Sequence, residues 1–323
     1  MQASMGPWLQ RSRRLLTLAI GLAALSGAVP GAQTPVPKPR PWTPPATEWG
    51  DPDLQAIWNY ATMTPLERPR DFADKATLTD NEAATYEQET NTRQRTQNST
   101  AGPDWWDPGT RRLLDRRTSL IVDPPDGRLP PTTPEAQARA ARNTQARRQR
   151  GEADGPEEFS LSVRCLSWGT AGPPMLPGVY NNNVQFVQTP HYIAIVSEMI
   201  HDARIVHMDG RPHPGVPQWM GDSRGRWEGR TLVVDTADFS AKTSVRGSDD
   251  RLHLTERFTR TSADTIEYQF TMDDPTVWTK PWTAAFPLRR TDERMFEYAC
   301  HEGNAPSIEG MLRAARVSER DGH

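Results

Sequence analysis

The stretch "LHLTERFTRTSADTIEYQFTM", residues 252–272, consists of two alternating segments separated by a short polar turn. In the second segment the even-numbered positions are apolar or aromatic and the residues between them are polar, the inner set being Ile266, Tyr268, Phe270 and Met272. A period of two predicts a strand with one face directed inward. In the first segment Leu252, Leu254 and Phe258 share the parity of Glu256. We therefore expect a hairpin whose inner face carries one carboxylate.

Short β runs separated by turn residues continue on both sides of this hairpin, from residue 119 onward. The further runs are "SLIVDPPDGR", "VQFVQ", "HYIAIVSEM", "ARIVHMDGR", "GRWEGRTLVVDT", "WTAAFPLRR" and "RMFEYAC". The last two runs predict an inner set of Trp282, Ala284, Phe286, Leu288, Phe296, Tyr298 and Cys300. In all, about nine strands with no βαβ alternation predict a mainly β chain, an antiparallel meander that closes as a barrel or forms a sandwich.

The predicted organisation has four parts. Residues 1–32 are expected to be a signal peptide, and residues 33–117 a proline-rich segment that wraps a core and holds one helix. That helix begins at Thr79, which forms a capping box with Glu82. Residues 118–316 are the β-barrel domain, with a helix at about residues 134–150 that is capped by Thr133. Residues 317–323 form a tail.

Export is indicated by the order of features in residues 1–32, where the basic stretch "RSRR" precedes the apolar run "LLTLAIGLAAL" and small residues. The segment "SRRLLT" is similar to a twin-arginine signal, so we expect a periplasmic or secreted protein. No later segment has the roughly 20 apolar residues of a membrane span. Cys165 and Cys300 are the only cysteines, and an oxidising compartment favours a disulfide between them over two separate buried thiols.

Charge argues against one class of partner. Loss of residues 1–32 would remove three arginines and no acid, leaving 35 basic and 41 acidic residues. A chain with this acidic excess is not expected to bind nucleic acid. The arginines of the helix at 134–150 are followed at once by "GEADGPEE", so they are interpreted as a solvated face.

Several segments resemble those of a large family of exported bacterial hypothetical proteins. They are "DPDLQAIWN", "TPLERP", "GPPMLPGVYNNN", "EMIHDAR", "QWMGDSRGRWEGRTLVVDT", "LHLTERFTR" and "YACHEGN". The resemblance extends from about Trp49 to Arg316 and implies no catalytic assignment. The strand pattern is also similar to that of calycin or lipocalin-like barrels, which implies a site for a small, largely apolar ligand.

Glu256 is the most informative candidate for a functional residue. A carboxylate on an apolar inner face must be hydrogen-bonded, paired with a cation or protonated, because an isolated buried charge costs several kcal/mol. If it is paired with Arg204 or Arg257, its role is structural. If it borders a water-accessible cavity, it can act as a general acid or base. Tyr268 is expected to point into the same interior.

The histidines provide the remaining acid/base candidates. His201 in "EMIHDAR" is close to Asp202 and Arg204, which can fix an imidazole tautomer or bind an anion, although an imidazole beside an acid is more often a satisfied turn histidine than a catalyst. His301 follows the last predicted strand, and His253 has the outward parity. These three histidines are conceivable zinc ligands, but no ligand spacing supports a metal, and no cofactor is expected. His207 and His213 flank a "DG" turn and are expected to be exposed.

Two classes of function follow from these residues. In the first, an exported lyase, hydratase or isomerase uses catalytic groups drawn from His201, His253, Glu256, Tyr298 and His301. Its substrate would be held by Asp202, Arg204, Tyr268 and Asn182, the last from the amide-rich "YNNN", which can also simply close a loop. In the second, the same barrel is a carrier or binding module for a small molecule. The sequence leaves the oligomeric state open.

Overall fold

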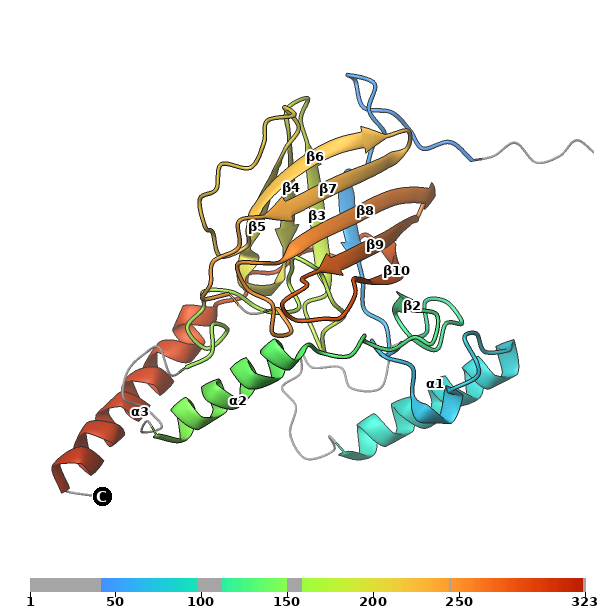
Figure 1. Ribbon diagram of the computed structural model, residues 1–323. Helices are drawn as coiled ribbons and strands as arrows, with labels where there is room; N and C mark the ends of the chain where they lie inside the picture. The colour runs from blue at the N-terminus through green and yellow to red at the C-terminus, as the bar shows by residue number, and fades with distance from the viewer. Residues whose placement is uncertain (1–41, 98–111, 150–158, 244, 322–323) are drawn as a thin grey trace, which may run out of the picture. The chain divides into compact units, whose positions relative to one another are not determined.

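The structure is a computed structural model that describes residues 42–97, 112–149, 159–243 and 245–321. Its central feature is a closed barrel of nine strands, drawn in Figure 1. The strands are β1 Ala56–Asn59, β3 Asn183–Gln188, β4 Tyr192–Ser197, β5 Ala203–His207, β6 Asp222–Glu228, β7 Thr231–Ala237, β8 His253–Ser262, β9 Thr265–Asp273 and β10 Trp282–Thr291. Strands β3 to β10 pair in chain order, and β1 closes the ring by pairing with β3 and β10. The predicted mainly β, lipocalin-like barrel is confirmed.

Three pairings differ from a simple meander. Strand β1 comes from the proline-rich segment, which therefore supplies a barrel strand as well as a wrapping chain. Strand β2, Ile121–Asp123, lies outside the ring and pairs with β10. Strands β5 and β6 are parallel, and they pair only at Val206 with Ser223 and at His207 with Arg224. The long connection at residues 208–221 makes the parallel pair possible, because parallel neighbours need a crossover.

The prediction of a strand at residues 294–300 is wrong. Residues 292–299 have no regular structure, and Cys300 begins helix α3, Cys300–Asp321. Phe296, predicted to point inward, is 72% exposed. The physical reason is that β10 is already hydrogen-bonded to β9 on one side and to β1 and β2 on the other, so no edge is left beside it for another strand.

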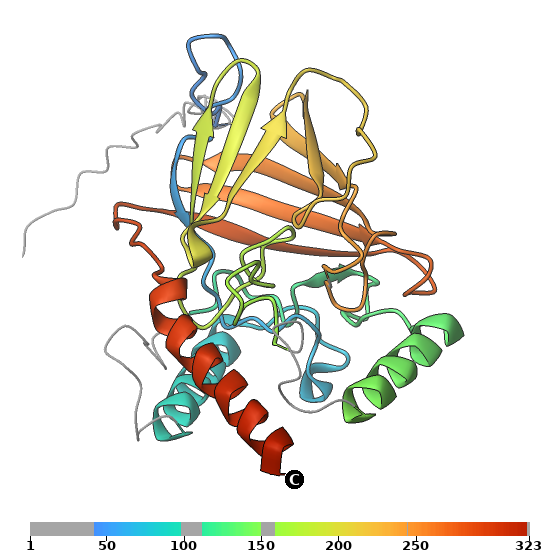
Figure 2. The same ribbon diagram turned by 90° about the vertical axis from the view of Figure 1, so that its left-hand side faces the viewer.

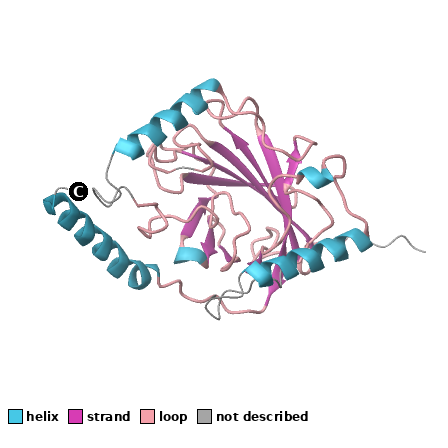
Figure 3. Ribbon diagram, turned by 90° about the horizontal axis from the view of Figure 1, so that it is seen from below, coloured by secondary structure: helices cyan, strands magenta, loops and turns pink. Residues whose placement is uncertain are grey.

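The two predicted helices are present as α1, Asp80–Gln97, and α2, Pro134–Gln149. At α1 the hydroxyl of Thr79 donates to Glu82 Oε2 at 2.8 Å, and the Glu82 amide donates to the same hydroxyl at 3.4 Å. At α2 the amide of Ala136 donates to Thr133 Oγ1 at 3.1 Å. With α3, these helices lie outside the ring of strands, as Figures 2 and 3 show. Two one-turn helices, η1 Arg70–Phe72 and η3 Met199–His201, complete the described elements.

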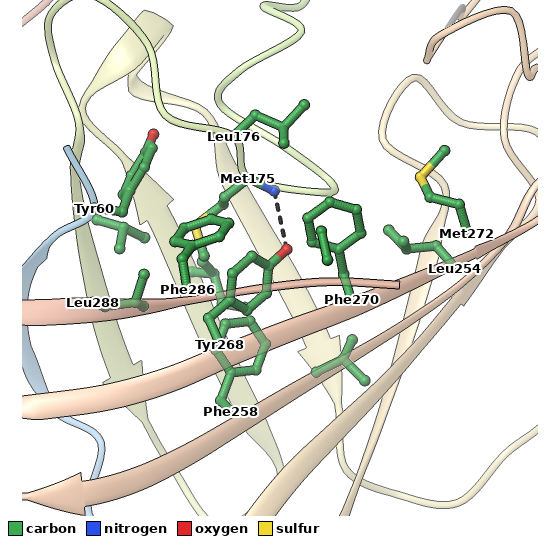
Figure 4. Packing of buried hydrophobic residues seen from close by; sticks show 14 of the residues in the cluster. Tyr60, Met175, Leu176, Leu254, Phe258, Tyr268, Phe270, Met272, Phe286 and Leu288 are labelled. Atoms are coloured by element: carbon green, nitrogen blue, oxygen red, sulfur yellow. Dashed lines mark hydrogen bonds between the residues drawn. The ribbon is translucent and has the colours of Figure 1, made fainter. Parts of the chain in front are cut away.

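The barrel interior is filled by the side chains that the alternating pattern predicted. The even-numbered residues of β8, β9 and β10 up to Leu288 are buried except for Ser262 at the end of β8. Phe258, Tyr268 and Phe270 have no exposed surface. Tyr268 stacks on Phe258 with ring centroids 4.8 Å apart and meets Phe286 edge-on at 5.2 Å (Figure 4). Burying each such aromatic contributes about 1.5–3 kcal/mol. The centre of the barrel is consequently a packed core.

The segment at residues 159–182 lies against the core and is held by the predicted disulfide. Met175 and Leu176 belong to the buried cluster, above Tyr268 in Figure 4. Cys165 and Cys300 are joined, with 5.9 Å between their Cα atoms. The sequence predicts a bond between this segment and the last strand. Because Cys300 starts α3, the bond instead ties the segment to a helix.

Candidate functional site

A buried polar chain crosses the barrel interior from β5 to the 159–182 segment. Arg204 on β5 pairs with Glu256 on β8 through both Nη atoms, Nη2 lying 3.1 Å from Oε1. The hydroxyl of Tyr268 on β9 donates to Oε1 of Glu256 at 2.7 Å, and the amide of Met175 donates to that hydroxyl at 3.1 Å. The side chains of Arg204 and Glu256 are 7% and 0% exposed. Glu256 is therefore the inward carboxylate that the alternation predicted, in the company of Arg204 and Tyr268.

The electrostatics of this chain favour the ionised pair. Burial by itself lowers the pKa of Arg204, but the charge of Glu256 and its hydrogen bonds outweigh burial and raise the pKa. Burial, reinforced by the Glu256 charge, raises the pKa of Tyr268 well above its ordinary value, so the phenol remains protonated and acts as a donor. Both carboxylate oxygens of Glu256 accept hydrogen bonds from these neighbours. This arrangement satisfies the buried charge, because both carboxylate oxygens are engaged with neighbouring side chains.

Arg204 also reaches a cavity beside the short parallel pairing of β5 and β6. The cavity has a volume of about 610 Å³ and is lined by Ala203, Arg204, Ile205, His207 and residues 217–223. His207 was expected to be exposed, but its Nδ1 atom is buried without a hydrogen-bond partner, and its ring meets Tyr192 edge-on at 5.4 Å. We call this space the strand-gap cavity, because it lies where β5 and β6 share only two residue pairs.

A second cavity lies next to the 159–182 segment, and we call it the mouth cavity. Its volume is about 510 Å³. Its aromatic walls are Phe159, Trp168, Trp219 and Phe239, and its basic residues are Arg164 and Lys242. Trp219 lines both cavities, so the two spaces adjoin at this residue. Cavities of this size are typical of small-ligand sites.

The outer face of the barrel carries a separate polar cluster. His213 was predicted to be an exposed loop residue, but it folds onto β6, where Nδ1 lies 2.8 Å from Oδ1 of Asp222 and Nε2 lies 3.5 Å from Oδ1 of Asp235. His253, outward as its parity indicates, places Nε2 2.7 Å from the same oxygen of Asp235. Arg224 completes the cluster by pairing with Asp222. The hydrogen bond with Asp235 raises the pKa of His253.

The structure does not bring the other predicted site residues to this interior. His201 is exposed in η3, where its φ is 48°, and His301 is exposed on α3. Tyr298 packs edge-on against Trp168 at 5.8 Å and stacks on Tyr180 at 6.2 Å, because its segment is not a barrel strand. Neither of the two cavities is lined by His201, His253 or His301.

The two remaining substrate-binding candidates, Asn182 and Asp202, line neither of the two cavities. Asn182 closes a loop, since its Oδ1 accepts from the amide of Gly178 at 2.6 Å and its Nδ2 donates to the Gly178 carbonyl. Asp202 is half-buried, and burial raises its pKa despite the nearby His201. Sequence reasoning missed Arg164, Trp219 and Lys242, which lie in segments without periodicity. The only available signal was the aromatic and basic composition of those loops.

Comparison of the chain with models of known families, with curated proteins and with solved structures finds no match. Among the described residues, no group of three or more histidine, cysteine or acidic side chains is arranged to hold a metal ion. Nor does any helix in the described part of the chain have the length and apolar character needed to cross a membrane. The functional assignment therefore depends on the geometry of the two cavities.

Proposed function

We propose that the barrel is a binding module for a small molecule, which it holds in the mouth cavity and the adjoining strand-gap cavity. The observation that carries this proposal is Trp219, a residue that lines both cavities. Aromatic walls with a few polar groups are typical of ligand pockets, because the walls provide affinity and the polar groups fix orientation. Because the interior is filled, the ligand is expected in these two cavities and not along the barrel axis.

A second candidate is the acid/base enzyme of the lyase, hydratase or isomerase type. Arg204 favours it, since this residue lines the strand-gap cavity and also holds Glu256. An anionic substrate that competes for the guanidinium would release the carboxylate for proton transfer. The binding module has the stronger support, because both oxygens of Glu256 accept hydrogen bonds and the other acid/base candidates do not converge on it.

The binding proposal is tested with N-phenyl-1-naphthylamine, a neutral aromatic probe whose fluorescence rises in an apolar site. We expect saturable binding to the folded chain and an affinity about tenfold weaker in Trp219→Ala, since truncating an aromatic anchor costs at least about 1.4 kcal/mol. Trp49→Ala is the matched control, because Trp49 is 37% exposed, borders neither cavity, and its indole donates to Asp51 in its own turn. Equal affinity in all three proteins, or no binding, would contradict the proposal.

We also propose that the chain is exported to the periplasm or medium by its first 32 residues, through the twin-arginine route. The order of basic, apolar and small residues supports this, and the disulfide is the kind of bond that an oxidising compartment preserves. N-terminal sequencing of the protein from fractionated cells should find a start near Val29 or Gln33. A cytoplasmic product that retains Met1 would overturn the proposal, and export that survives loss of the twin-arginine pathway would overturn the route.

A further inference from the structure

We infer that the mouth cavity selects an anionic ligand with a planar apolar body. This inference rests on the proposed binding function and names its ligand class. The chemistry comes from two basic side chains, Arg164 and Lys242, that border the same cavity as an aromatic wall. An aromatic carboxylate, sulfonate or phosphate shares the required features, which are one flat apolar face and one negative group.

The charge argument begins with the partners of the two basic residues. Neither Arg164 nor Lys242 forms an ion pair among the described residues, whereas Arg204, Arg224 and Arg257 are each paired with a carboxylate. The described lining of the mouth cavity contains no acidic side chain. A ligand anion there would meet two cations whose charge no described carboxylate neutralises. In a partly enclosed space that attraction is screened less than on an open surface.

The shape argument comes from the aromatic residues of the lining. Phe239 is buried, and Trp168 is already fixed by edge-on contacts with Tyr180 and Tyr298 at 6.3 and 5.8 Å. Trp219 is held through its backbone, whose carbonyl accepts from the hydroxyl of Thr243 at 2.8 Å. Walls whose side chains are already ordered, as those of Phe239 and Trp168 are, lose little side-chain freedom when a flat ligand binds. These walls favour a planar body over a flexible chain.

A matched pair of probes tests the inference, because 8-anilinonaphthalene-1-sulfonate is N-phenyl-1-naphthylamine with an added sulfonate. We expect the sulfonate probe to bind the folded, disulfide-bonded chain more tightly than the neutral probe, with a preference that decreases as salt is added. Arg164→Met and Lys242→Met should each weaken binding of the sulfonate probe about fivefold, the scale of one partly exposed charge contact. Both substitutions should leave the neutral probe unaffected.

Lys280→Met is the matched control, because Lys280 is exposed and borders neither cavity. Circular dichroism and urea unfolding show whether each variant is folded before its affinity is compared. Equal affinities for the two probes in the parent chain, insensitive to Arg164→Met and Lys242→Met, would overturn the anionic class and leave the binding module intact. If the parent chain binds neither probe, or if Trp219→Ala does not weaken binding, the binding module itself is overturned.

Discussion

Replacing Glu256 by glutamine tests whether the buried polar chain is structural. The substitution keeps the shape of the side chain but removes the charge that faces Arg204 inside the barrel, where the two side chains are 0% and 7% exposed. Leaving one partner of a buried pair without its counter-charge costs about 3–5 kcal/mol. Since the whole unfolding free energy of a domain is about 5–15 kcal/mol, the loss would be a large part of it. We expect a clearly less stable chain.

Urea unfolding followed by tryptophan fluorescence, with the disulfide intact, measures this loss at an unchanged m value. Glu267→Gln is the matched control, because Glu267 lies on the same sheet but is 38% exposed and pairs with Arg117 at 2.9 Å. Such a surface pair contributes less than about 1 kcal/mol. In a double-mutant cycle, Arg204→Met with Glu256→Met should cost less than the sum of the single substitutions, since neither charge is left alone.

Two results would refute this reasoning. The first is a loss in Glu256→Gln no larger than that in Glu267→Gln, which would mean that the pair carries no buried charge. The second is unchanged stability together with abolished ligand binding or turnover, which would make Glu256 a site residue and favour the enzyme of the second candidate function. A large loss of stability with probe affinity preserved in the folded fraction supports the structural role.

Three further predictions concern the disulfide, a helix cap and the outer polar cluster. Thiol titration of the parent chain under denaturing, non-reducing conditions should find no free thiol, and two titratable thiols would contradict the bond with Cys300. Because the bond joins residues 135 apart, Cys165→Ser should lower the free energy of unfolding by up to about 5 kcal/mol. Thr79→Ala should destabilise the first turn of α1 by about 1 kcal/mol, seen as faster amide exchange there, and unchanged exchange would contradict the capping role. Because the hydrogen bond with Asp235 raises the folded-state pKa of His253, its contribution to stability is fully present below the unfolded pKa of about 6.5 and disappears as pH rises through the folded value. His253→Gln should therefore cost less than about 1 kcal/mol near pH 6, the side chain being 49% exposed, and nothing at pH 9; a cost that does not change with pH would contradict the pairing.

The sequence by itself determined the elements whose signals are local. The alternation in β8, β9 and β10 predicted which side chains fill the barrel, because a period of two assigns every second residue to one face and a register shift by one residue would expose the whole set. The same parity placed Glu256 and Tyr268 in one interior and turned His253 outward. The two helix starts could be predicted because a cap is formed by residues three apart.

Only the tertiary structure decided the features that depend on distant pairing. Strand β1 has only four residues, yet it pairs with β3 and β10 and closes the ring. The run at 294–300 has the pattern of a strand, but the closed ring leaves no free edge with which it could pair. The choice of Arg204 as the partner of Glu256 followed from the placing of β5 across the interior, which no local pattern encodes. The cavities are likewise formed by segments that are far apart in sequence, at residues 159–173, 203–207, 217–223 and 239–243. Loops have no periodicity, so their side chains acquire a common site only when the barrel fixes where each loop begins and ends.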